Sequence, residues 1–123
     1  MAVKYKVLIA EDEKPMAKAL QLKLSNVGFD VRVAGNGEEA LAALEKEQFD
    51  IMLLDLVMPK LDGFGTLQAI AAKKIKVPVI ITSNLSQEED KARTRELGAV
   101  DYIVKSDTPI NQIVETVKKH LKM

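Results

Sequence analysis

One short apolar run, residues 51–54 (IMLL), constrains the fold of this chain more than any other stretch. It carries no charge, is followed at once by Asp55, and then by a break at Pro59 and a predicted turn at Asp62-Gly63. A charge-free run of this length is typical of a strand buried on both faces of a parallel sheet. The end of such a strand reaches the edge where open α/β folds bind their ligands. We therefore interpret Asp55 as a carboxylate held at the border of a dry core for chemistry.

Four further segments have the composition of strands, and helical patterns alternate with them along the chain. We predict strands at 7–10, 30–34, 51–54, 77–82 and 100–104, and helices at 14–27, 38–48, 63–74, 87–97 and 110–121. Alternating strands and helices indicate right-handed βαβ units. The predicted fold is one α/β domain over residues 1–123, with a doubly wound parallel sheet and helices on both of its faces.

The predicted helix at 87–97 differs from the others because only Ala92 and Leu97 are apolar in it. A face this thin predicts weak docking on the sheet and low local stability. We expect this segment to be the part of the molecule that moves between two states.

Composition narrows the classes of function. Eighteen basic and eighteen acidic residues cancel, which argues against a nucleic-acid or membrane surface held by bulk charge. The absence of cysteine excludes disulfides and thiolate metal sites. Acidic residues interrupt the first apolar run, so we expect no signal peptide. No segment reaches the ~20 apolar residues of a membrane span, and we predict a cytoplasmic protein without a membrane partner.

Polar side chains follow four of the predicted strands. Glu11 and Asp12 come after the first strand, Asp55 after the third, Ser83 after the fourth and Lys105 after the fifth. Because the carboxyl ends of parallel strands open onto one edge of a doubly wound sheet, we expect these side chains to converge there.

Charge repulsion indicates what this edge binds. Two carboxylates about 5 Å apart repel by about 3 kcal/mol at an effective dielectric of about 20, and their pKa values rise unless a cation lies among them. Lys105 supplies one positive charge for three acids, so we expect Mg²⁺ to complete the site. Such a set suits an aspartyl phosphate: Asp55 attacks phosphorus, Mg²⁺ and Lys105 neutralise the phosphoryl oxygens, and Ser83 hydrogen-bonds one of them.

In combination, these motifs resemble the receiver domain of two-component response regulators. The resemblance spans nearly the whole chain and is carried by Glu11-Asp12, Leu54-Asp55, Met58-Pro59, Asp62-Gly63, Ile81-Thr82-Ser83, Gly98-Ala99-Val100-Asp101-Tyr102 and Lys105. It implies a flavodoxin-like (βα)5 three-layer sandwich with strand order 2-1-3-4-5.

The resemblance implies that Asp55 is the phosphoacceptor for a sensor histidine kinase or a histidine phosphotransfer protein. It further implies that the Asp12 and Asp55 carboxylates and the Val57 backbone carbonyl bind Mg²⁺, with Glu11 acting through a water. By the same resemblance, the protein would promote its own phosphorylation and dephosphorylation and turn over no separate substrate.

Three further positions acquire roles by the resemblance. Lys105 would contact the phosphoryl group, and Ser83 would be the switch hydroxyl, in preference to the neighbouring Thr82. Tyr102 matches the aromatic residue that turns inward when that hydroxyl moves. We expect phosphorylation to change the surface made by the 87–97 helix, the fifth strand and the last helix. An unknown downstream protein would recognise the changed surface. The chain would be a monomer or a phosphorylation-dependent dimer through that surface, and would not bind nucleic acid directly.

Two departures from the family pattern bear on the site. The family usually has Lys-Pro, commonly with a cis bond, where this chain has Lys105-Ser106. A non-proline cis bond costs about 3 kcal/mol, so we predict a trans bond with the following loop displaced. Val57 and Leu85 are apolar where the family is often polar, and we expect them to shield the acyl phosphate from water and lengthen its lifetime.

Several alternative functions share part of this pattern. Because the last predicted helix runs close to Met123, we expect no output domain in this chain, which would act alone or be the receiver excised from a longer transcriptional regulator. A haloacid-dehalogenase-like phosphohydrolase would need a second Asp as general acid where this chain has Val57. A flavodoxin-like cofactor-binding protein would need a phosphate-binding loop where this chain has acids after the first strand. A degenerate receiver that works without phosphorylation conflicts with the intact acid, hydroxyl and lysine set.

Overall fold

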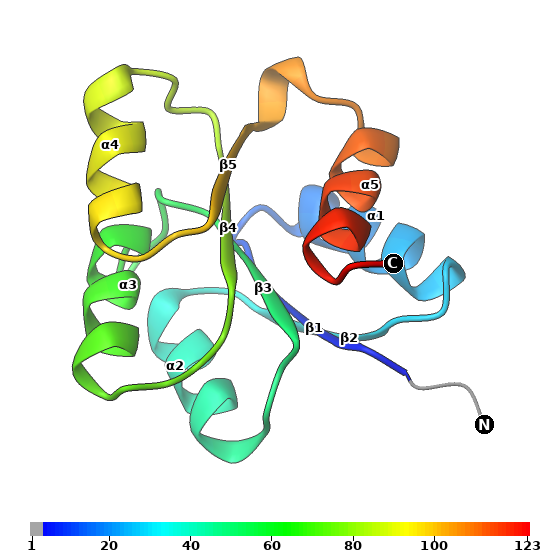
Figure 1. Ribbon diagram of the computed structural model, residues 1–123, viewed down its shortest axis with the longest axis horizontal. Coiled ribbons are helices and arrows are strands. Elements are labelled where there is room, and N and C mark those ends of the chain that lie inside the picture. Colours follow the sequence, from blue (N-terminus) through cyan, green and yellow to red (C-terminus); the bar gives the residue numbers. More distant parts are fainter. Residues whose placement is uncertain (1–3) are drawn as a thin grey trace.

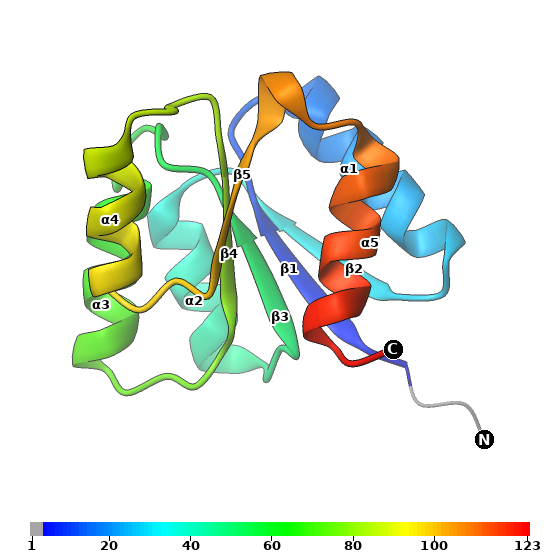
Figure 2. The ribbon, with the colours of Figure 1, turned by 45° about the horizontal axis from the view of Figure 1, so that its top comes forward.

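The computed structural model describes residues 4–123, which form a five-stranded parallel sheet between two layers of helices (Figures 1 and 2). The strand order is β2-β1-β3-β4-β5, which confirms the predicted fold class and topology. The first three residues of the predicted 1–123 domain lie outside this description. The strands are β1 (Lys6–Ala10), β2 (Asp30–Ala34), β3 (Ile51–Leu54), β4 (Val79–Ser83) and β5 (Asp101–Val104).

Five helices cover the two faces of the sheet. Helices α1 (Lys14–Asn26) and α5 (Ile110–His120) lie on one face, at the right in Figure 1. Helices α2 (Gly37–Lys46), α3 (Gly63–Ala72) and α4 (Glu88–Glu96) lie on the other. A short 3-10 helix that was not predicted, η1 (Lys105–Asp107), joins β5 to α5. In the described part of the chain, no helix has the length and apolar character needed to cross a bilayer.

Strand β3 belongs to both cores of the molecule. Met52 and Leu54 pack in the cluster shared with α2 and α3, whereas Ile51 and Leu53 pack in the cluster shared with α1 and α5. All four side chains are 0% exposed. Burial on both faces therefore explains why this strand carries no polar residue.

The strand register brings the carboxyl ends of the strands together at one edge, the upper edge in Figure 2. Ala10 pairs with Leu54 at the end of β1 and β3, and the Asp55 amide donates to the Ala10 carbonyl at 3.0 Å. Ser83 pairs with Val104 at the end of β4 and β5. The next residues along each strand are therefore placed at the same edge.

The Asp62-Gly63 pair is not a turn, contrary to the prediction. Asp62 is the N-cap of α3, where its Oδ1 accepts from the Gly65 amide at 2.8 Å, and Gly63 is the first helical residue. A Cβ on Gly63 would lie 2.4 Å from the Asp55 carbonyl oxygen, so glycine is needed for close approach. The left-handed residue of this loop is Lys60, with φ of 68°.

Other differences lie at the ends of elements. Val27, the last residue of the helix predicted at 14–27, is exposed and follows the end of α1. Val77 and Pro78 precede β4, which starts at Val79 and includes Ser83. Ala71 is on the exposed side of α3. Each change follows from tertiary burial, which a pattern of apolar residues locates only to within a residue or two.

Candidate functional site

Three carboxylates meet at the carboxyl edge of the sheet. Glu11 and Asp12 directly follow β1, Asp55 directly follows β3, and one oxygen from each lies within 4.8 Å of the others. Glu11 is 2% exposed and Asp55 is 4% exposed, whereas Asp12 faces solvent. The structure thus brings together the acids that the sequence placed after neighbouring strands.

Lys105 is the cation of this cluster. It directly follows β5, and its ammonium donates to Glu11 Oε1 at 2.7 Å and to Asp55 Oδ2 at 3.4 Å. A third carboxylate, that of Glu13, lies 3.4 Å from the same nitrogen. The nearest partner is therefore Glu11 rather than Asp55. Sequence reasoning gave Glu13 no place in the site, although its position two residues after Glu11 on the same loop was a usable signal.

Burial and the hydrogen bond between Lys105 and Glu11 dominate the electrostatics of the cluster. Burial raises the pKa of Glu11 to about 7, the Asp55 carboxylate adds to the rise, and the hydrogen bond from Lys105 opposes it. Burial pulls the pKa of Lys105 down, but the Glu11 hydrogen bond and the neighbouring carboxylates outweigh it and the pKa is raised. Four acids around one ammonium leave an excess of negative charge that calls for a further cation.

The donor set of this cluster fits a hard divalent ion. Carboxylate oxygens from three residues converge, and oxygen ligands of this kind suit Mg²⁺. In residues 4–123, no ion pair engages Asp12, so its carboxylate is available as a ligand. The Val57 backbone lies beside the cluster, since its amide donates to Asp55 Oδ1 at 3.4 Å.

A cavity of about 280 Å³ opens above these groups. It is lined by charged and polar side chains that lie near the strand ends and by two apolar ones, namely Asp12, Glu13, Asp55, Ser83, Asn84, Lys105, Val57 and Leu85. Val57 is 62% exposed and Leu85 is 36% exposed. The mouth of an otherwise polar cavity therefore has apolar side chains on its rim.

Ser83 is the hydroxyl residue that faces the cavity. It is the last residue of β4, is fully buried, and its Oγ accepts from the Leu85 amide at 3.2 Å. Thr82 is buried as well but does not line the cavity. This placement supports the choice of Ser83 over Thr82.

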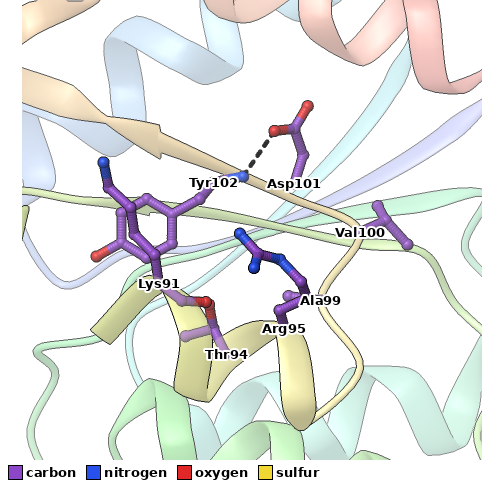
Figure 3. A pocket seen from close by; sticks show the side chains of 7 residues that line it. All are labelled: Lys91, Thr94, Arg95, Ala99, Val100, Asp101 and Tyr102. Atoms are coloured by element: carbon purple, nitrogen blue, oxygen red, sulfur yellow. Dashed lines mark hydrogen bonds between the residues drawn. The ribbon is translucent and has the colours of Figure 1, made fainter. Parts of the chain in front are cut away.

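Tyr102 connects this edge to helix α4. The half-buried side chain donates from Oη to the Leu85 carbonyl at 2.5 Å, and burial raises the pKa of its hydroxyl, which remains a donor at neutral pH. Figure 3 shows its ring beside the Lys91 side chain of α4, and the Lys91 ammonium is 6.0 Å from the ring centroid. A second cavity, of about 340 Å³, lies here between α4 and β5.

The segment after Lys105 has the predicted trans backbone and makes one contact that was not predicted. All peptide bonds in residues 4–123 are trans, which confirms the prediction for Lys105-Ser106. The Ser106 amide donates to Asn84 Oδ1 at 3.0 Å. Sequence reasoning gave Asn84 no place in the site, although an amide side chain directly after the strand hydroxyl was a usable signal.

Comparison with known proteins gives one family. A family model described as a response regulator receiver domain matches residues 7–118. The probable transcriptional regulator ycf27 of Porphyridium aerugineum is 43% identical over 86% of this chain and 44% of its own length. The alkaline phosphatase synthesis transcriptional regulatory protein PhoP of Bacillus subtilis is 38% identical over 85% of this chain and 43% of its own length. The chain thus spans less than half of these relatives.

Among solved structures, the receiver domain of Francisella response regulator 1452 superposes with a TM-score of 0.91. It is 34% identical in sequence, over 97% of this chain and 98% of that one.

Proposed function

Because this chain belongs to the response regulator receiver family, we propose that it is a phosphoacceptor switch. Asp55 would accept a phosphoryl group from a sensor histidine kinase or a histidine phosphotransfer protein. The position of the Asp55 carboxylate carries the proposal: it ends a fully buried strand, lies within 4.8 Å of two other acids, and is 3.4 Å from the Lys105 ammonium.

The proposed reaction forms one bond and breaks one bond. A carboxylate oxygen of Asp55 attacks phosphorus, and the P–N bond to the donor histidine breaks, with the electron pair passing to the imidazole nitrogen, which takes up a proton. The product is an acyl phosphate. Lys105 moves its hydrogen bonds from the carboxylates to a phosphoryl oxygen, and Ser83 donates its hydroxyl hydrogen to another.

The acid cluster supports a requirement for Mg²⁺. The Asp12 and Asp55 carboxylates and the Val57 backbone carbonyl would hold the ion, with Glu11 acting through a water. When bound, Mg²⁺ would offset the repulsion between these acids and the incoming phosphoryl oxygens. The chain's own residues would promote its phosphorylation and dephosphorylation, and we expect no turnover of a separate substrate.

A chain of contacts leads from Ser83 to α4. The Ser83 hydroxyl holds the Leu85 amide, and the Leu85 carbonyl holds the Tyr102 hydroxyl. A phosphoryl group that draws Ser83 toward it would release Leu85 and let Tyr102 turn inward, away from Lys91. We therefore propose that the α4-β5-α5 surface reports the phosphorylation state to a downstream protein, as a monomer or through a phosphorylation-dependent dimer. A cytoplasmic location is part of this proposal.

A second role is favoured by the relatives. This chain matches 44% and 43% of their lengths, so each is about twice as long as this chain, and both carry the names of transcriptional regulators. The same switch would then act on a further segment of a longer regulator, and through it on transcription, rather than on a separate protein. The coding sequence on either side of the chain distinguishes these two arrangements.

Intact mass after incubation with a small phosphodonor and Mg²⁺ tests the proposed function. The wild type should gain one phosphoryl group and Asp55→Asn should gain none. Asp50→Asn is the matched control, because Asp50 precedes the same strand at its opposite end, where its carboxylate accepts from the Lys6 amide at 2.7 Å. Labelling of Asp55→Asn, or absence of labelling in the wild type, would contradict the proposal.

A further inference from the structure

The pairing of β4 with β5 ends where the phosphoacceptor site begins. Ser83 and Val104 form the last pair, and beyond them the two chains diverge toward α4 and η1. One hydrogen bond crosses this divergence: the Ser106 amide donates to Asn84 Oδ1 at 3.0 Å. The Asn84 side chain therefore adds one cross-strand bond past the end of the ladder.

Chemistry fixes the orientation of the Asn84 side chain. A backbone N–H only donates, so the amide oxygen of Asn84 must face Ser106. Ser106 has this hydrogen because it is not proline, which lacks a backbone N–H. Asn84 also lines the cavity that contains Asp55 and Lys105. The Asn84 side chain that accepts this bond is therefore part of the lining of the site.

A hydrogen bond that fixes the position of the Ser106 nitrogen also restrains the backbone of Lys105. The peptide unit from the Lys105 Cα to the Ser106 Cα is planar and stiff, so fixing the Ser106 nitrogen fixes the Lys105 Cα and carbonyl. The Lys105 ammonium lies between Glu11, at 2.7 Å, and Asp55, at 3.4 Å. The backbone position decides which of the two carboxylates a long flexible side chain reaches.

We propose that Asn84 is a positioning residue for phosphoryl transfer: by binding the Ser106 amide, it keeps the Lys105 ammonium within reach of the phosphoryl group on Asp55. The proposal rests on the proposed function, because it assigns Asn84 a part in the same reaction. It adds a residue that directly follows β4 and whose effect is exerted through the backbone beyond β5.

The rate of phosphorylation by a small phosphodonor tests this role. Asn84→Ala should slow phosphorylation at saturating donor by between about twofold and about tenfold, the range that one neutral hydrogen bond covers. The apparent Mg²⁺ affinity should stay unchanged, because Glu11, Asp12 and Asp55 are held by β1 and β3. A general loosening of the site would alter both quantities. Ser106→Ala keeps the N–H and should phosphorylate at the wild-type rate.

A second variant at Ser106 tests the bond itself. Ser106→Pro removes the N–H and also disfavours the helical backbone of Lys105, so its rate should fall at least as far as that of Asn84→Ala. Adding Asn84→Ala to Ser106→Pro should cause no further loss, whereas adding it to Ser106→Ala should cause the full loss. The positioning role would be overturned if Asn84→Ala slowed phosphorylation further in the Ser106→Pro variant. It would also be overturned if Asn84→Ala alone kept the wild-type rate.

The amide proton shift of Ser106 separates this proposal from the proposed function. The shift should move upfield in Asn84→Ala without any phosphodonor present. A wild type that accepts no phosphoryl group would refute the proposed function and the positioning role with it, even if the amide shift still reported the bond. A phosphorylated wild type with an unmoved Ser106 shift in Asn84→Ala would refute the positioning role alone.

Discussion

Every side chain of strand β3 is buried, whereas helix α4 buries only Thr94. The contacts from Ser83 through Leu85 to Tyr102 run between these two elements. The two elements are stabilised in different ways. Strand β3 is fixed by packing against both helical layers. The acids of the site are attached to its end and to that of β1, so their backbone positions are set before any ligand arrives.

Helix α4 forms largely through its own charges. Glu88, Glu89 and Asp90 occupy its first turn and Arg93 and Arg95 its last, which suits the helix dipole. The hydroxyl of Thr94 bonds within the helix, to the Lys91 carbonyl at 2.9 Å. A cavity lies between the helix and β5 (Figure 3). The difference teaches that the acid cluster is built on packed strands, whereas α4 is stable as a helix but weakly docked, as the proposed switch requires.

The largest expected effect is at the buried strand. Leu54→Ala should lower the free energy of unfolding by about 2–5 kcal/mol, because Leu54 is fully enclosed and the cavity left behind cannot collapse. Urea unfolding followed by circular dichroism measures the change. A decrease of less than about 1 kcal/mol in the free energy of unfolding would show that β3 is not the more rigid of the two elements.

A smaller loss of stability is expected where α3 meets Asp55. Gly63→Ala should cost about 1–3 kcal/mol, because its Cβ would lie 2.4 Å from the Asp55 carbonyl oxygen and 2.6 Å from the Leu56 Cα, both backbone atoms. It should also slow phosphorylation by displacing Asp55. Gly65→Ala is the matched control: its Cβ meets the flexible end of Leu61, so stability should be kept or raised. Equal losses of stability in Gly63→Ala and Gly65→Ala would contradict this explanation.

On the mobile side, Thr94→Ala should cost about 1 kcal/mol or less in global stability. Its main effect should be local: amide exchange within α4 should speed up while exchange in β3 stays unchanged, since α4 opens without the rest of the molecule. Hydrogen exchange read by mass spectrometry resolves the two segments. If exchange in β3 accelerated equally, the two regions would form one cooperative unit.

The smallest expected effect concerns the lifetime of the acyl phosphate. Val57→Asn should speed loss of the phosphoryl group several-fold, because an exposed apolar side chain on the cavity rim is replaced by one that binds water. Stability should hardly change at so exposed a position. Val33→Asn, at an exposed apolar position on edge strand β2, is the control and should leave the rate unchanged. An unchanged rate in Val57→Asn would refute the shielding role.

The spacing of apolar residues predicted most of the fold, because it differs between the buried strands and the helices that cover them. The charge-free run before Asp55 indicated a central buried strand, and turn residues separated it from the helices. The thin apolar face at 87–97 also predicted the weak docking of α4, although its one buried residue is the polar Thr94. Helix and strand ends shifted because capping and burial, rather than apolar spacing, decide them.

The site was predictable up to the point where side-chain direction matters. Strand ends placed Glu11, Asp55 and Lys105 at one edge, because parallel strands share their carboxyl side. That Lys105 bonds most closely to Glu11, and that Asn84 holds Ser106, depends on loop geometry. The Asp62-Gly63 pair was interpreted as a turn because glycine also serves close packing, which only the surrounding atoms reveal.

The coupling between the rigid site and the mobile helix is the central claim, and amide NMR tests it most directly. Spectra of the chain with Mg²⁺ should be compared before and after addition of a phosphate mimic, with Asp55→Asn as the control. The account predicts large shifts from Glu88 to Tyr102, small shifts in β1 and β3 away from their ends, and none in the control. Unmoved signals from Glu88 to Tyr102 in the wild type, with the mimic bound at Asp55, would contradict it.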